Sequence, residues 1–135
     1  MLASLTNNPD VYFIVGGTTH LVFWLSYKLL ARKWFLFLAI LISVVFAIIA
    51  FNMQGVEALQ NKVGYAANWL LSPGLFLIIY LIFRLLFKAI FKNEPIMAGY
   101  MQFSWEQGEY RRLHLGDSLF TVITLFLPML IPLWI

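Results

Sequence analysis

The residue whose chemistry stands out is His20, one of two histidines in the chain, which lies in the middle of an apolar run from Val11 to Leu30. If that run is helical, His20 lies about 14 Å along it. Small and hydroxyl residues precede it, from Gly16 to Thr19, and such residues let helices approach closely and hydrogen-bond across their contact. An imidazole there would suit a proton relay or a contact to a polar solute. The simpler interpretation is a neutral imidazole that hydrogen-bonds within a packed helix interface.

A second polar group lies nearer the C-terminal end of the chain. Asp117, Thr121 and Thr124 are spaced by four and three residues, so on a helix they would share one face. Together with the imidazole, this stripe could line a path for a proton, an ion or a solute. Its first member also has a simpler role, because Asp117 or Ser118 would cap a helix by accepting a backbone N–H.

Basic residues form a third group, since Arg84, Lys88 and Lys92 recur every four residues and would occupy one helical face. Such a face suits anionic lipid headgroups or an acidic partner, and anchoring of the helix end is the plainer role. Arg84 lies about two turns inside the helix, where it could pair with Asp117 or extend its side chain toward the membrane surface.

The segment 93–117 is richer in polar, aromatic and charged residues than any other part of the chain. It is therefore where a partner protein or lipid headgroups are expected to bind. The candidate contact residues are Trp105, Glu106, Glu109, Tyr110, Arg111 and Arg112.

Metal, cofactor and catalytic sites are not predicted. Glu106, Glu109, His114 and Asp117 match no metal-binding spacing, and the neighbouring arginines oppose a cation. Haem is not expected, because His114 lies in the polar segment rather than at the depth of His20. No nucleophile, base and orienting acid can be assembled from the sequence, so the case for an enzyme is weak.

The composition indicates whether most of the chain is surrounded by water or by lipid. Of 135 residues, 62% are hydrophobic and only 11% are charged, with a mean hydropathy of +0.86, whereas soluble domains are about a quarter charged. So few charges cannot cover a core of this size. We therefore expect an all-α integral membrane protein, without disulfides or thiolate sites because there are no cysteines.

The hydropathy pattern predicts one membrane domain with four transmembrane helices in two hairpins. The predicted spans cover residues 11–30, 34–52, 69–91 and 118–135. Val56, Leu59 and Val63 recur at helical spacing, which predicts a short interfacial helix near 55–64. Within 93–117, alternating apolar residues favour a small β-hairpin, and a surface helix broken at Gly108 is the alternative.

Orientation follows from the excess of Lys and Arg in cytoplasmic loops. In this topology eight basic residues lie on one side and only Lys62 lies on the other, so both termini are expected outside. The eight are Lys28, Arg32, Lys33, Arg84, Lys88, Lys92, Arg111 and Arg112.

Two functions are favoured by these observations, and a third, a lipid-modifying enzyme, would depend on Glu106 or His114. The first is a non-catalytic membrane subunit of a larger complex or of a homo-oligomer, docking through its cytoplasmic 93–117 loop. The alternative is a small oligomeric channel or transporter with a polar path near His20 and Asp117. Both place the chain in the bilayer, for which we expect a bacterial cytoplasmic (inner) membrane, with other membrane subunits or copies of itself as partners and no nucleic acid.

Overall fold

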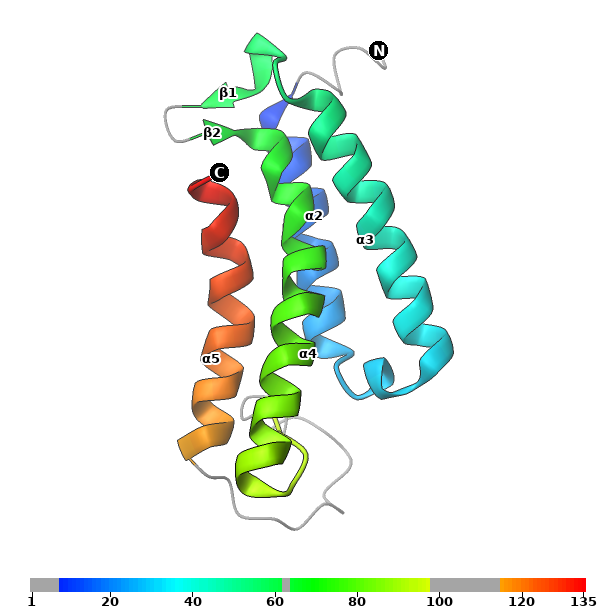
Figure 1. Cartoon of the computed structure of the whole chain (residues 1–135). Coiled ribbons are helices and arrows are strands. Elements are labelled where there is room, and N and C mark those ends of the chain that lie inside the picture. The colour runs from blue at the N-terminus through cyan, green and yellow to red at the C-terminus, as the bar shows by residue number, and fades with distance from the viewer. Residues whose placement is uncertain (1–7, 62–63, 98–114) are drawn as a thin grey trace.

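The computed structural model describes residues 8–61, 64–97 and 115–135. Within these ranges the chain forms a bundle of long α-helices joined by short 3₁₀ segments (Figure 1). The helices are α2 (Pro9–Leu25), α3 (Lys33–Met53), α4 (Ser72–Phe91) and α5 (Leu115–Leu130). The short 3₁₀ segments are η1 (Leu29–Ala31), η2 (Glu57–Leu59), η3 (Ala66–Leu71) and η4 (Ile131–Leu133).

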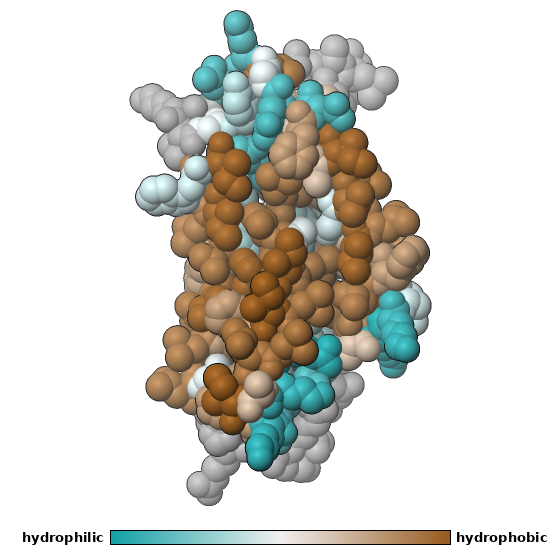
Figure 2. All heavy atoms as spheres, viewed as in Figure 1, coloured by the Kyte–Doolittle hydropathy of each residue, from teal (hydrophilic) through white to brown (hydrophobic). Residues whose placement is uncertain are grey.

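Among the residues that the structure describes, three helical stretches are long and apolar enough to cross a membrane: Lys33–Met53, Ala66–Phe91 and Leu115–Leu133. Their outward faces carry exposed Leu, Ile, Val and Phe side chains. Figure 2 shows these apolar side chains as a broad band between two hydrophilic ends. Membrane localisation therefore follows for the chain, whereas α2, with 17 residues, is about 25 Å long and slightly shorter than a bilayer core.

The predicted bounds of the first and the last span differ most from the structure. The first helix ends at Leu25 rather than Leu30, because the apolar run continues into a turn whose Leu30 is 1% exposed and packs in the protein core. The last helix already includes Leu115 and is followed at Ile131 by 3₁₀ turns that contain Pro132, a residue that cannot donate a helical hydrogen bond.

The predicted interfacial helix near 55–64 is wrong. The chain instead makes one 3₁₀ turn, η2, and a two-stranded antiparallel sheet of β1 (Gln60–Asn61) and β2 (Gly64–Tyr65). Gly55 has φ +97° and Gly64 has φ +149°, backbone conformations that interrupt a helix and favour glycine. The apolar residues that suggested a helix in this segment are explained by packing, because Leu59 is fully buried against the bundle. We call this end of the bundle the hairpin end.

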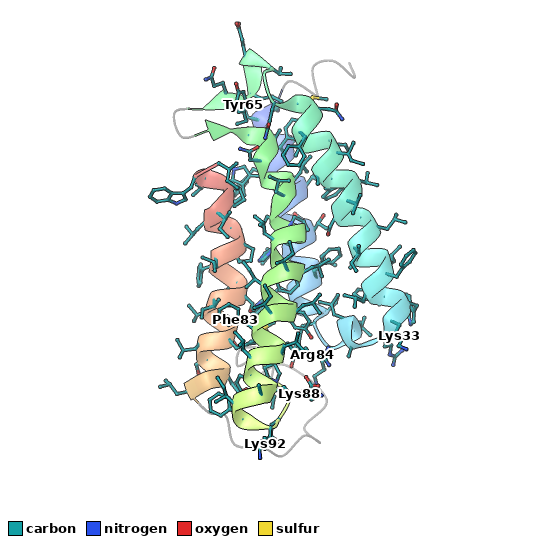
Figure 3. The ribbon with its side chains drawn as sticks, in the orientation of Figure 1. Lys33, Tyr65, Phe83, Arg84, Lys88 and Lys92 are labelled. Carbon is teal, nitrogen blue, oxygen red and sulfur yellow. The ribbon has the colours of Figure 1, made fainter. Side chains whose placement is uncertain are left out.

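The opposite end carries the cations and is called the basic end here. It holds the turn from α2 to α3 and the end of α4, and Figure 3 shows Lys33, Arg84, Lys88 and Lys92 gathered there, with Tyr65 at the hairpin end. The predicted β-hairpin or surface helix in 93–117 falls mainly on residues 98–114, which lie outside the described part of the chain.

Helices α2 and α4 run in the same direction, because α3 returns the chain to the hairpin end between them (Figure 1). Helix α2 also packs closely on η3, which leads into α4: a Cβ added at Gly16 would overlap the Trp69 carbonyl oxygen and lie 2.6 Å from its carbon. The rings of Phe13 and Trp69 pack edge to face at 4.7 Å beside it. A glycine at this position therefore allows two backbones to touch.

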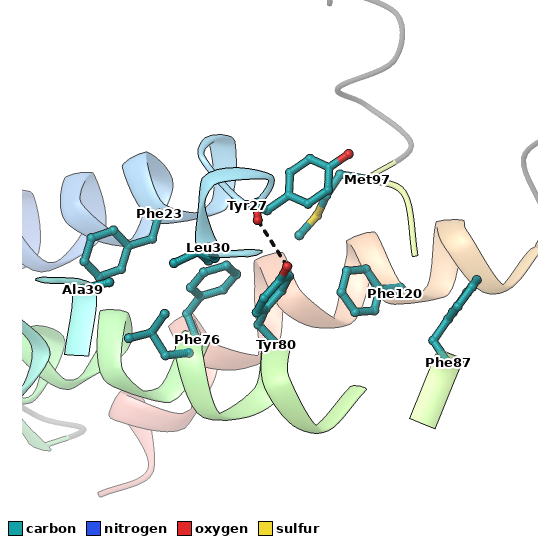
Figure 4. Close-up of a cluster of buried hydrophobic side chains, with 10 residues drawn as sticks. Phe23, Tyr27, Leu30, Ala39, Phe76, Tyr80, Phe87, Met97 and Phe120 are labelled. Carbon is teal, nitrogen blue, oxygen red and sulfur yellow. Dashed lines mark hydrogen bonds between the residues drawn. The ribbon is translucent and has the colours of Figure 1, made fainter. Parts of the chain in front are cut away.

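The core toward the basic end is a cluster of aromatic side chains between α2, α4 and α5 (Figure 4). Phe76 stacks on Tyr80 with ring centroids 5.7 Å apart, and Tyr80 meets Phe120 edge to face at 5.9 Å. The Tyr80 hydroxyl donates to the Tyr27 carbonyl oxygen at 3.1 Å. This cluster fixes the relative depth of the three helices.

Candidate functional site

His20 lies at the meeting point of α2, α4 and α5 and is fully buried. Its Nε2 is 3.1 Å from the Leu125 carbonyl oxygen, and its ring packs edge to face on Phe76 at 5.2 Å. A carbonyl oxygen only accepts, so the neutral imidazole carries its proton on Nε2 and presents a lone pair at Nδ1. Pro128 lies inside α5 just beyond this contact and removes a helical N–H donor from this stretch.

The other ring nitrogen, Nδ1, is buried without a well-directed hydrogen bond, and the Ser72 backbone is a second backbone hydrogen-bond partner of the imidazole besides that of Leu125. Other buried polar atoms among the described residues also lack a well-directed hydrogen bond, including the Trp24 indole nitrogen, the Ser72 hydroxyl and the Asn68 side-chain nitrogen. Ser72 and Asn68 are fully buried. They lie four residues apart where η3 continues into α4.

The threonines of the predicted polar stripe are engaged within their own helix. Thr121 Oγ1 donates to the Asp117 carbonyl oxygen and Thr124 Oγ1 to the Phe120 carbonyl oxygen, both at 2.7 Å. Such bonds to the preceding turn satisfy a hydroxyl without any ligand. Thr19 is partly exposed, so it does not share the full burial of its neighbour His20.

Asp117 is fully buried, and its Oδ1 accepts from the Ile96 backbone N–H at 2.9 Å. It is the third residue of α5, so the predicted cap at Asp117 or Ser118 is wrong, because the helix already includes Leu115. The side chain instead joins the segment after α4 to the first turn of α5. That bond holds together the two ends of residues 98–114.

Glu94 is the acidic partner of the basic face of α4. Arg84 Nε and Nη2 donate to Glu94 Oε2 and Oε1 at 2.7 and 3.1 Å, and Lys88 Nζ donates to Oε1 at 3.1 Å. The Arg84 hydrogen bonds, followed by that of Lys88, hold the pKa of Glu94 below its usual 4.5. Arg84 therefore pairs with Glu94 rather than with Asp117.

Helix α4 ends where Lys92 adopts a left-handed conformation with φ 57°, which turns the chain back toward the bundle. Pro95, Ile96 and Met97 are then buried. Met97 Sδ lies 3.7 Å from Thr124 Oγ1, which is in the third turn of α5. This non-helical stretch is therefore enclosed by protein, which is the condition under which irregular backbone is tolerated in a membrane protein.

The predicted site residues thus separate into three groups. His20, Thr124 and Asp117 lie in the interior, while Arg84 and Lys88 form an ion-pair cluster at the basic end. Thr19 and Thr121 are partly buried, and Lys92 is exposed at the end of α4. The other predicted site residues lie outside the described residues: Trp105, Glu106, Glu109, Tyr110, Arg111 and Arg112. Among residues 8–61, 64–97 and 115–135, no three His, Asp or Glu side chains gather closely enough to hold a metal.

Sequence reasoning missed Asn68, Ser72 and Glu94. The first two carry a detectable signal, since they are polar residues four apart at the start of an apolar helix. Glu94 follows the end of α4, and its pairing depends on the chain reversal at Lys92, which spacing along a helix cannot predict.

Comparison of the chain with protein-family models, curated proteins and solved structures gave no significant match.

Proposed function

We propose that this chain is a non-catalytic membrane subunit of a larger complex or a homo-oligomer, which docks through its 93–117 segment. In this proposal the chain crosses the bilayer four times, with the basic end in the cytoplasm and both termini outside. The excess of Lys and Arg at the basic end supports that orientation.

The observation that carries the proposal is the anchoring of the segment at both of its ends. Ile96 N–H donates to the Asp117 carboxylate at 2.9 Å, and both residues are buried. Met97 is also fully buried beside Thr124. When both ends of a segment are fixed to the same place, the segment loses less conformational freedom on binding a partner than a segment with free ends does.

The bonding of the interior polar groups also supports a structural role. Thr121 and Thr124 donate to their own helix, and Asp117 accepts from Ile96. These groups are used to hold the helix ends and the returning segment. A subunit requires such fixed internal contacts, whereas a catalyst would require polar groups directed at a substrate.

The test is the mass of the intact, tagged protein extracted from its native membrane in mild detergent. We expect an assembly larger than the monomer, which Trp105→Ala combined with Tyr110→Ala reduces to a monomer. The matched control is Trp34→Ala, because Trp34 is 61% exposed at the same end of the bundle but on the other hairpin.

Two results would overturn the docking role. One is a wild-type protein that is a lone monomer under these conditions. The other is an assembly that persists unchanged when residues 100–113 are replaced by a Gly/Ser linker and the bundle remains folded.

A second candidate is a small oligomeric channel or transporter, favoured by the complete burial of His20, Thr124 and Asp117. It predicts proton, ion or solute flux into liposomes that is lost in His20→Ala and Asp117→Asn variants that still fold. Flux that is absent, or that is the same in both variants, would exclude this function.

A further inference from the structure

Glu94 lies on two cations at the basic end in the way that a bound anion would. Arg84 approaches its carboxylate with two donors, Nε at 2.7 Å from Oε2 and Nη2 at 3.1 Å from Oε1, and Lys88 Nζ adds a third at 3.1 Å from Oε1. A guanidinium that binds two oxygens of one anion in this manner binds phosphate equally well. Arg84 and Lys88 therefore form an oxyanion site that the chain fills with its own carboxylate.

This site lies at the depth of lipid headgroups. Figure 3 shows Arg84 at a similar level to Lys33, the first residue of α3, and Lys88 farther toward the basic end. Trp34 follows Lys33 and is 61% exposed, and tryptophan is enriched where membrane-spanning helices meet the headgroups. An anion bound to Arg84 and Lys88 would thus lie at the membrane surface, where the phosphates of phospholipids are found.

The surface of α4 beside the two cations is apolar and open. Leu85 comes three residues before Lys88, so the two side chains are neighbours on the helix. Leu85 is 69% exposed and Ile82 is 51% exposed. A phospholipid matches both parts of this surface, because its phosphate can bind the cations while its acyl chains cover the apolar side chains. A soluble anion would use the cations alone.

Glu94 can be displaced without opening the fold around it. Its side chain is 48% exposed and that of Lys88 is 60% exposed, and ion pairs this exposed contribute little to stability. The chain beyond it is held separately, because the Ile96 N–H donates to the buried Asp117 carboxylate at 2.9 Å. A phosphate can therefore replace the Glu94 carboxylate through a movement of that side chain alone.

The charge at the basic end favours an anionic headgroup. Among the described residues, Glu94 is the exposed acidic side chain at this end, since Asp117 is buried. The described cations there are six: Lys28, Arg32, Lys33, Arg84, Lys88 and Lys92. Such a surplus attracts a headgroup with net negative charge, whereas in a zwitterionic headgroup the attached cation offsets the phosphate.

We propose that Arg84 and Lys88 form a binding site for the phosphate of an anionic phospholipid in the leaflet at the basic end, with Glu94 as the internal competitor for that site. The site does not depend on the docking of segment 93–117 to a partner.

The experiment is native mass spectrometry of the intact chain in detergent, in which phosphatidylglycerol is titrated and phosphatidylcholine is the reference lipid. We expect phosphatidylglycerol to bind more tightly than phosphatidylcholine. Glu94→Gln should raise the affinity for phosphatidylglycerol by up to about fivefold, which is the effect of removing one exposed ion pair that competes. Lys88→Gln should lower that affinity, and Arg84→Gln, which removes the two-donor contact, should abolish the preference for the anionic lipid.

Two control variants make the same changes of charge at the basic end but away from the site. Ala31→Lys adds one positive charge at an exposed residue of η1, and so changes the net charge as Glu94→Gln does. Lys33→Gln removes one positive charge, as Lys88→Gln does. Both should change the affinity less than their counterparts. Equal effects would show general attraction to the basic end and would overturn the site.

Two further outcomes would contradict the proposal. If glycerol phosphate bound as tightly as phosphatidylglycerol, the site would belong to a soluble phosphate rather than to a lipid. If Glu94→Gln left the affinity for phosphatidylglycerol unchanged or lowered it, Glu94 would not compete with the lipid. Misfolding cannot imitate the expected result, because this variant is expected to gain binding.

Discussion

At the residue scale, the function of a side chain in this bundle depends on whether its polar atoms already have partners. His20 was identifiable from the sequence as a polar group within an apolar run, and its complete burial is what the structure adds. Its partners were not predictable, because the Leu125 carbonyl is 105 residues away in the chain. For the threonine stripe the spacing was misleading. It predicted hydroxyls that line a path, whereas the hydroxyls donate to carbonyl oxygens of their own helix, α5.

Gly16 and Gly17 provide a direct test of packing at single-residue resolution. Gly16→Ala should lower stability by about 1–3 kcal/mol, because the new methyl would overlap the Trp69 backbone, which cannot move like a flexible side chain. Gly17→Ala meets no atom within 4 Å and should be neutral or stabilising, because alanine favours helix. Unfolding in detergent micelles measures both, and equal effects of the two substitutions would contradict the described contact.

The Glu94 ion pairs predict a pH dependence of stability. The pKa of Glu94 is lowered in the folded chain by Arg84 and then Lys88, so its contribution is present above the usual pKa of 4.5 and is lost as the pH falls through the lower folded value. The Glu94 side chain is 48% exposed, so the contribution should not exceed about 1 kcal/mol.

The measurement compares wild type with Glu94→Gln. Wild type should unfold at the higher temperature near about pH 7, and the difference should shrink as the pH falls below 4.5. A difference that is constant across this range would show that the carboxylate charge is not responsible.

At the scale of elements, apolar length predicted the helices and local backbone geometry set their ends. The four runs appear as α2, α3, α4 and α5, but the first ends five residues early, because Leu30 packs in the core beyond a turn. The segment near 55–64 was misread because its apolar spacing was treated as helical, whereas Gly55 and Gly64 take positive φ values. Hydropathy reports burial, and it does not distinguish burial in lipid from burial in protein.

Helix α3 provides the test at this scale. Its buried residues are all small, Ala39, Ser43 and Ala50, and we call them its small-residue face. Only 17% of its apolar stretch is buried, against 44% for Ala66–Phe91. Its Ser43 lies against Gly74, where an added Cβ would be 3.5 Å from the Ser43 Cβ. Ser43→Leu should therefore destabilise the bundle by about 1–3 kcal/mol.

Val44→Leu is the matched control, since Val44 is the next residue on α3 and is 52% exposed. It should leave stability nearly unchanged in the same unfolding assay. If Ser43→Leu and Val44→Leu lowered stability equally, α3 would not pack through its small-residue face.

At the scale of the whole molecule, the bundle is polar at both ends and apolar between them (Figure 2). The Lys and Arg residues described in the structure lie at one end of it. Composition was sufficient to predict a membrane protein, because so little charge cannot solvate a soluble core. Composition could not predict which elements meet, such as the backbone contact that Gly16 of α2 makes with Trp69 of η3.

Topology is the most direct test of the central claim that the chain crosses the membrane four times with its basic end in the cytoplasm. The chain has no cysteine, so single-cysteine variants can be labelled with a membrane-impermeant maleimide without interference. Thr6→Cys and Glu57→Cys should be labelled in intact cells, whereas Lys33→Cys and Lys92→Cys should be labelled only after permeabilisation. Labelling of Thr6→Cys and Lys33→Cys from the same side would show that α2 does not cross, and would contradict the four-span account.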